Sequence, residues 1–171
     1  MRSLASVLLR HGTPRRGARP GRPGGQTAKA PNHGSRAPDI AVLGGFQVSE
    51  KGDLANWKIP GYKGSGGIGG AMDIAAGSKK LIVCMEHNTK EDVPKIVKTC
   101  NYPLTGLECV DIIVTDLAVI DVTPEGLVLR ETAPGWTPEE VQARTEAKLI
   151  VRGQVPGMNL SAHSPQPAVK S

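Results

Sequence analysis

The feature of this sequence best suited to chemistry is a glycine-rich segment, Lys-Gly-Ser-Gly-Gly-Ile-Gly-Gly-Ala-Met-Asp, which contains five glycines at residues 63–73. Glycine tolerates positive φ and lets a ligand approach main-chain N–H groups closely. Where such a segment leads into a helix, those groups can bind a phosphate or stabilise an oxyanion. The segment lacks the GK[ST] ending of a P-loop, and a Rossmann motif would need an acidic residue closing the second strand. A tight structural turn is the alternative.

Cysteine and histidine form no metal-binding or redox pattern. The three cysteines, Cys84, Cys100 and Cys109, are odd in number and have no CxxC spacing. The sequence therefore predicts neither a disulfide framework nor a zinc site, and a reducing compartment fits best. Cys84 lies in the apolar run 81–85, where a buried thiol is the default, and the nearby His87 does not complete a metal site.

Charge divides the chain into an arm and a body. Residues 1–38 contain seven arginines, one lysine, five prolines, six glycines and no acidic residue, whereas residues 39–171 have a net charge of −3. This composition predicts a disordered basic tail. A slightly acidic body with 3% aromatic residues argues against a nucleic-acid-binding face, so we expect no nucleic-acid partner.

The first 11 residues combine arginine and serine without an acidic residue, which is typical of an organellar transit peptide. Translation of GC-rich DNA in another reading frame explains the same arginine, glycine, proline and alanine content equally well. No window approaches the ~18 to 20 consecutive apolar residues that span a bilayer. We therefore expect a soluble protein without a membrane partner.

Hydrophobic patterning predicts an α/β body over residues 39–151. An apolar run at 40–43, which 46–48 extends, is predicted as a buried strand, and 49–70 as a long loop. A short helix over 71–77 and a second strand over 80–85 then complete a βαβ pattern. The later elements are a helix over 93–100, a turn at 103–106, strands within 110–122, a turn at 123–126, a strand at 127–129, a helix over 137–147, a strand at 149–151 and an unstructured tail over 152–171.

Four short sequence motifs, in this order and spacing, resemble the B subunit of 3-oxoacid CoA-transferases of the succinyl-CoA:3-ketoacid type. They are Gly-Asp-Leu-Ala-Asn-Trp at 52–57, Gly-Ile-Gly-Gly-Ala-Met-Asp at 67–73, Met-Glu-His at 85–87 and Cys-Asn-Tyr-Pro-Leu-Thr-Gly at 100–106. The resemblance covers about 39–151. It implies part of a CoA-transferase-type (NagB/RpiA-like) α/β fold with a mostly parallel sheet, flanked here by two disordered tails.

The same resemblance implies CoA transfer between succinate and a 3-oxoacid such as acetoacetate or 3-oxoadipate, through a glutamyl-CoA thioester on the enzyme. Gly67, Gly69 and Gly70 would belong to a loop that stabilises the thioester oxyanion. Asn56 would be a polar residue of the active site, with a structural Asx turn as the alternative. The CoA thioester is a substrate in this chemistry, and the resemblance implies no permanently bound cofactor or metal. The implied partner is a CoA-transferase A subunit.

The sequence departs from the family in one respect that concerns the nucleophile. The family's catalytic glutamate lies in a Ser-Glu-Asn-Gly motif upstream of the Gly-Asp-Leu-Ala-Asn-Trp motif. None of the nine glutamates in this sequence is followed by Asn-Gly. Glu86 lies in one of the four family motifs, at the end of a predicted strand. The resemblance therefore implies a structural role or a polar role in the site for Glu86, and not the role of the nucleophile. We expect negligible transferase activity from this chain alone.

Two functional hypotheses follow from that departure. The chain is either the C-terminal part of a CoA-transferase B subunit or a non-catalytic pseudo-subunit that pairs with an A subunit. A parallel sheet without the family's front half would expose an apolar surface and an open edge. Residues 39–151 resemble bacterial sequences, which favours the cytoplasm as the location. Residues 1–11 give the mitochondrial matrix as the alternative.

Overall fold

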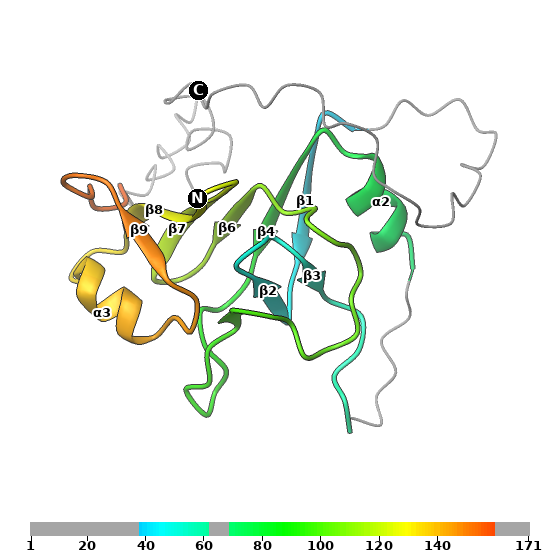
Figure 1. The fold of residues 1–171 in the computed structure, drawn as a ribbon, viewed down its shortest axis with the longest axis horizontal. Coiled ribbons are helices and arrows are strands. Elements are labelled where there is room, and N and C mark those ends of the chain that lie inside the picture. Colours follow the sequence, from blue (N-terminus) through cyan, green and yellow to red (C-terminus); the bar gives the residue numbers. More distant parts are fainter. Residues whose placement is uncertain (1–37, 62–68, 160–171) are drawn as a thin grey trace, which may run out of the picture. The chain divides into compact units, whose positions relative to one another are not determined.

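The computed structural model describes residues 38–61 and 69–159. The chain divides into two units, and the elements below all lie in the unit formed by Gly34–Met158. In this described part, six strands form a mixed sheet in the order β1-β4-β6-β7-β8-β9 (Figure 1). They are β1 (Ile40–Gly44), β4 (Lys80–Cys84), β6 (Ile112–Val114), β7 (Ala118–Thr123), β8 (Gly126–Thr132) and β9 (Leu149–Val151).

Parallel pairing dominates this sheet, as predicted. Strands β1, β4 and β6 run parallel, β7 pairs antiparallel with both β6 and β8, and β9 is parallel to β8. Leu81, Ile82 and Val83 are all buried, because a central parallel strand packs on both faces. The connection from β1 to β4 passes through α2 (Ala71–Gly77), so the predicted βαβ unit is confirmed.

A second, smaller sheet was not predicted from the sequence. It has the order β3-β2-β5 and consists of β2 (Gln47–Ser49), β3 (Leu54–Ala55) and β5 (Ile96–Val97). Strand β2 pairs antiparallel with β3 and parallel with β5. The predicted loop over 49–70 therefore contains a short strand.

The predicted helix over 93–100 is wrong, because β5 occupies its centre. Ile96 and Val97 are neighbours in sequence and are both buried, whereas a surface helix buries one face only. The Val48 N–H donates to the Lys95 carbonyl at 3.0 Å, and Pro94 has no N–H to offer a helix. Long-range pairing with β2 thus decides the conformation of this segment.

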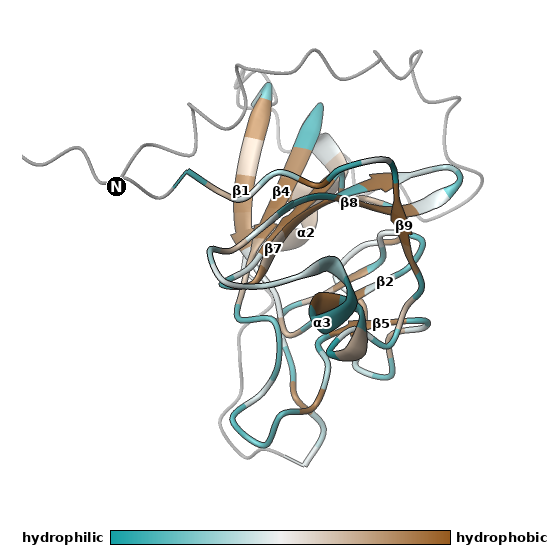
Figure 2. Cartoon of the chain, turned by 90° about the vertical axis from the view of Figure 1, so that its left-hand side faces the viewer, coloured by the Kyte–Doolittle hydropathy of each residue, from teal (hydrophilic) through white to brown (hydrophobic). Residues whose placement is uncertain are grey.

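The core lies between one face of the six-stranded sheet and three other elements. Val83, Ile113 and Ile120 of the sheet belong to one buried cluster with Ala75 of α2 and Val141 of α3 (Pro138–Ala143), and Ile96 of the smaller sheet is in the same cluster. In Figure 2 the central strands are mainly hydrophobic, while the connecting loops are mostly hydrophilic. Helix α3 begins where the sequence predicts a helix, and Thr137 and Glu140 form a capping box there.

Two boundaries differ from the prediction. Helix α3 ends at Ala143 rather than near residue 147. Order also continues beyond residue 151, because the Thr132 N–H donates to the Pro156 carbonyl at 3.2 Å and the Met158 N–H donates to the Thr132 carbonyl at 2.7 Å. The part of the predicted tail from 152 to 159 therefore follows the end of β8, and the tails at 1–37 and 160–171 lie outside the described residues.

Strand β1 is an edge of the six-stranded sheet with an apolar, half-exposed face. Ile40 is 47% exposed and Val42 is 48% exposed, while Ala41 between them is buried. Among the described residues, exposure of this apolar face is confined to the edge strand, because Ile82, which pairs with Val42, is buried. No helix among the described residues is long and apolar enough to cross a membrane.

Candidate functional site

The carboxyl ends of three neighbouring parallel strands define the region where a site is expected. β1, β4 and β6 are paired in register, with Gly44 opposite Cys84 and Cys84 opposite Val114, so the residues that follow each strand emerge at one edge of the sheet. In open α/β sheets, ligands bind outside this edge. Glu86 follows β4 and Asp116 follows β6, and both side chains are exposed.

Asn56 is fixed beside the end of β1 by three hydrogen bonds. Its backbone N–H donates to the Thr105 hydroxyl at 3.1 Å, and that hydroxyl donates to Asn56 Oδ1 at 2.6 Å. Asn56 Nδ2 donates to the Gly44 carbonyl at 3.1 Å. The side chain therefore braces the loop at 100–106 against β1, and one amide hydrogen is left for other contacts.

The glycine-rich segment is described only at its end. Gly69 has φ +46 and Gly70 is the residue before α2; both are exposed. A methyl group added at Gly70 would meet no atom of the described residues within 4 Å. The helix ends at Gly77, and β4 begins at Lys80, so the helix runs back along the sheet and its start lies toward the carboxyl edge. Gly67 lies outside the described residues.

Glu86 lines a pocket of about 350 Å³. The pocket does not include Asn56, Gly69 or Gly70, so the structure does not join all the predicted residues into one cavity. Residues from three separate parts of the chain line it: Glu86, His87, Asn88, Thr89, Lys90, Asp92, Asp116, Leu117, Trp136 and Arg144.

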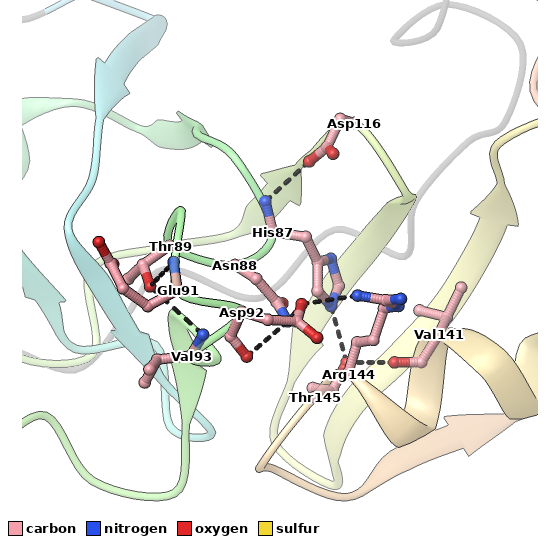
Figure 3. Close-up of polar contacts among 10 residues, drawn as sticks. All are labelled: His87, Asn88, Thr89, Glu91, Asp92, Val93, Asp116, Val141, Arg144 and Thr145. Atoms are coloured by element: carbon pink, nitrogen blue, oxygen red, sulfur yellow. Dashed lines mark hydrogen bonds and ion pairs between the residues drawn. The ribbon is translucent and has the colours of Figure 1, made fainter.

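A hairpin over residues 87–95 forms one wall of this pocket, and Trp136 and Arg144, which flank α3, form the other. Figure 3 shows the polar contacts between Arg144 and the hairpin. Arg144 joins the walls, because its guanidinium forms an ion pair with Asp92 at 2.6 Å and lies 5.1 Å from the centre of the Trp136 ring. The Asn88 amide donates to Asp92 Oδ1 at 2.8 Å. The wall is thus held by charge-assisted and cation–π contacts.

His87 connects both walls to the sheet. The imidazole is 1% exposed, with Nδ1 2.9 Å from the Thr115 hydroxyl and Nε2 2.8 Å from the Thr145 hydroxyl. Its backbone N–H donates to Asp116 Oδ1 at 2.7 Å. Burial lowers the pKa of His87 to about 4; the Asp116 carboxylate opposes this shift and the Arg144 guanidinium adds to it.

The thiols have no feature of an activated nucleophile. Burial raises the pKa of Cys100 to about 12 and also raises that of Cys84, and Cys109 is buried. A nucleophilic cysteine needs a lowered pKa. Among residues 38–61 and 69–159, no group of three or more histidine, cysteine or acidic side chains could hold a metal ion.

Sequence reasoning named Glu86 and missed the rest of the pocket. His87, Trp136 and Arg144 are far apart in the sequence and stand in no spacing that marks a site. The only local sequence signal for this pocket was the histidine in the motif Met-Glu-His at 85–87, because a polar ring next to an apolar strand needs hydrogen-bond partners.

The chain is similar in sequence to known coenzyme A transferases. The family model described as Coenzyme A transferase matches residues 28–144. The B subunit of the 3-oxoadipate CoA-transferase of Acinetobacter baylyi is 51% identical over 112 residues, covering 66% of this chain and 52% of that protein. The B subunit of a probable succinyl-CoA:3-ketoacid coenzyme A transferase of Bacillus subtilis is 50% identical over 117 residues, 68% of this chain and 54% of that protein. The chain spans about half the length of the curated relatives it matches.

Solved structures agree at the level of the fold. An acyl-CoA transferase apoenzyme from Escherichia coli O157:H7 has a TM-score of 0.62 at 22% identity, covering 71% of this chain and 28% of that chain. Glutaconate coenzyme A-transferase from Acidaminococcus fermentans has a TM-score of 0.55 at 23% identity, covering 70% of this chain and 52% of that chain. The expected CoA-transferase-type α/β fold is therefore confirmed.

Proposed function

Because this chain belongs to the coenzyme A transferase family, we propose that it forms part of the B subunit of a two-subunit enzyme that transfers CoA from succinyl-CoA to a 3-oxoacid. The observation that carries this proposal is the identity of about one half to relatives named for that chemistry. Those names give two acceptor acids, a 3-ketoacid and 3-oxoadipate. The CoA thioester enters as a substrate, and no permanent cofactor is part of the proposal.

The proposed chemistry has two addition steps on each side of the reaction. A glutamate carboxylate attacks the carbonyl carbon of succinyl-CoA, CoA thiolate leaves, and a glutamyl-succinyl anhydride forms. The thiolate then attacks the glutamyl carbonyl and releases succinate, which leaves a glutamyl-CoA thioester. The 3-oxoacid carboxylate repeats these steps in reverse order and takes the CoA. Each addition places negative charge on a carbonyl oxygen.

We propose that Gly67, Gly69 and Gly70 supply backbone N–H groups for that oxygen. Two observations on the described glycines support the role: both are exposed, and they lead into a helix whose start lies toward the carboxyl edge of the sheet. Asn56 and Glu86 are proposed as polar residues near the same edge. Asn56 acts there mainly through its bonds to Thr105 and Gly44.

We assign no residue of this chain as the nucleophile, since none of its glutamates lies in a Ser-Glu-Asn-Gly motif. An oxyanion loop and binding alone leave roughly 10³ to 10⁴-fold acceleration in a protease that has lost its nucleophile, and enzymes usually exceed 10⁶-fold. The full chain, mixed with the A subunit that partners the Acinetobacter baylyi relative, is therefore expected to bind that protein and to show negligible CoA transfer. Turnover by this mixture would contradict the proposal.

A chimera tests whether this half of the protein is competent. Residues 1–38 are replaced by the part of the Acinetobacter baylyi B subunit that precedes its match. We expect CoA transfer from succinyl-CoA to a 3-oxoacid to return. We also expect it to disappear when the catalytic glutamate is changed to glutamine, the one that the family resemblance implies for a Ser-Glu-Asn-Gly motif in the grafted part. Gly70→Ala in the chimera probes the loop, because its methyl group would meet no atom of residues 38–61 and 69–159 within 4 Å; we expect kcat to fall about 10-fold or more.

The second candidate is a non-catalytic pseudo-subunit that pairs with an A subunit. Binding to the A subunit together with an inactive chimera would select this candidate over the first. We propose the cytoplasm as the location, in line with the bacterial relatives; a mouse relative, 46% identical over 114 residues, is named as mitochondrial and supports the alternative.

A further inference from the structure

The hydrogen bonds around His87 determine which of its ring nitrogens carries the proton. Both ring nitrogens have a threonine hydroxyl as partner, Thr115 at Nδ1 and Thr145 at Nε2. A neutral imidazole has one N–H and one acceptor nitrogen. Either arrangement satisfies the ring itself, so the decision falls on the two hydroxyl groups.

The Thr115 hydroxyl excludes a proton on Nδ1. Its oxygen already accepts the N–H groups of Leu117 at 3.2 Å and Ala118 at 2.9 Å, and a hydroxyl oxygen has two lone pairs. A third donor from Nδ1 would have no lone pair left. The hydroxyl must therefore donate to Nδ1 at 2.9 Å, in preference to its longer contact of 3.2 Å with the Ala118 carbonyl.

The Thr145 hydroxyl fits the same solution. It donates to the Val141 carbonyl at 2.7 Å, which leaves its oxygen free to accept the Nε2–H at 2.8 Å. The bonds then run in one direction, from Thr115 through His87 and Thr145 to Val141 of α3. Figure 3 shows the part of this chain from His87 to Val141. A doubly protonated ring would again direct an N–H at the saturated Thr115 oxygen.

We propose that His87 is a positioning residue: a neutral imidazole, protonated on Nε2, that holds the hairpin 87–95 and α3 together and so sets the pocket lined by Glu86. Its backbone N–H holds Asp116, and Asp92 of the hairpin pairs with Arg144 after α3. The charged groups that act on the ring are Asp116 and Arg144.

The first test is ¹⁵N NMR of the histidine rings in the full chain. The sequence has four histidines, and the His87 signals are those that His87→Gln removes. We expect one ring with a proton on Nε2 and a bare Nδ1 at neutral pH, unchanged down to about pH 5 because the pKa lies near 4. A proton on Nδ1, or titration near the ordinary value of ~6.5, which an unfolded chain would also give, overturns the proposal.

The second test compares His87→Leu with His87→Gln by amide hydrogen exchange. Glutamine keeps one donor and one acceptor, whereas leucine fills the space without either. The amides of Thr89 and Lys95, bonded across the hairpin to Val93 and His87, should exchange about 10-fold faster or more in His87→Leu and less in His87→Gln. The Val122 amide, bonded to Asp111, is the control.

Unchanged hairpin exchange in His87→Leu, or equal acceleration in both variants, contradicts the positioning role. Acceleration of the Val122 amide to the same extent would assign His87 a general structural role and also contradict it. If His87→Leu does not fold, the ring NMR of the unsubstituted chain decides the proposal alone.

Discussion

At the scale of single residues, Gly52 and Gly135 have nearly the same φ and very different surroundings. Their φ values are +87 and +85, but a methyl group at Gly52 would lie 2.9 Å from the Val110 carbonyl oxygen, whereas at Gly135 it would meet no atom of the described residues within 4 Å. Gly135→Ala should cost about 1 kcal/mol for the left-handed backbone. Gly52→Ala should cost about 3 kcal/mol, since crowding against backbone adds about 1 to 3 kcal/mol.

Urea unfolding of the two variants measures the difference directly, because the backbone strain is common to both. Equal midpoints would mean that the contact between the chain at Gly52 and Val110 is not tight in solution. Two backbone hydrogen bonds accompany that contact, because the N–H groups of Cys109 and Val110 both donate to the Gly52 carbonyl.

At the scale of elements, β1 is the part of the sheet expected to cause association. Ile40 and Val42 lie half-exposed on an edge strand, and such strands pair with other chains unless a charge intervenes. Val42→Lys should reduce concentration-dependent association and leave the free energy of unfolding within about 0.5 kcal/mol. Light scattering over a concentration series, with thermal unfolding, measures both quantities.

Ala41→Lys is the matched control, one residue away on the opposite face of β1. Ala41 is buried in the core cluster, so a lysine there should unfold the chain because an unpaired buried charge is not tolerated. Association that persists unchanged in Val42→Lys would place the contact elsewhere.

At the scale of the whole molecule, net charge predicts where any affinity for polyanions resides. The full chain carries +5, and residues 39–171 carry −3. Retention on heparin at low salt should therefore disappear when residues 1–38 are removed, and in the full chain it should weaken as salt screens the charges. Retention by residues 39–171 would contradict this and would reopen a nucleic-acid function for the folded part.

Elements that depend on neighbouring residues could be predicted from the amino-acid order. The capping box of Thr137 and Glu140 starts α3, the turn at 123–126 joins β7 to β8, and apolar runs form β1, β4 and β9. Each of these rests on hydrogen bonds or side-chain contacts within a few residues. The four family motifs likewise identified the family, because their order and spacing are properties of the sequence alone.

Features that depend on distant partners emerged only in the folded chain. Residues around Ile96 form a strand because they pair with β2, although their local pattern predicts a helix. Residues 156–158 are ordered because they pair with Thr132. His87 meets Thr115 and Thr145, and Asp92 meets Arg144, across separations that no motif spans. Such contacts form where strands and loops converge in space, so their energy depends on the fold and not on local spacing.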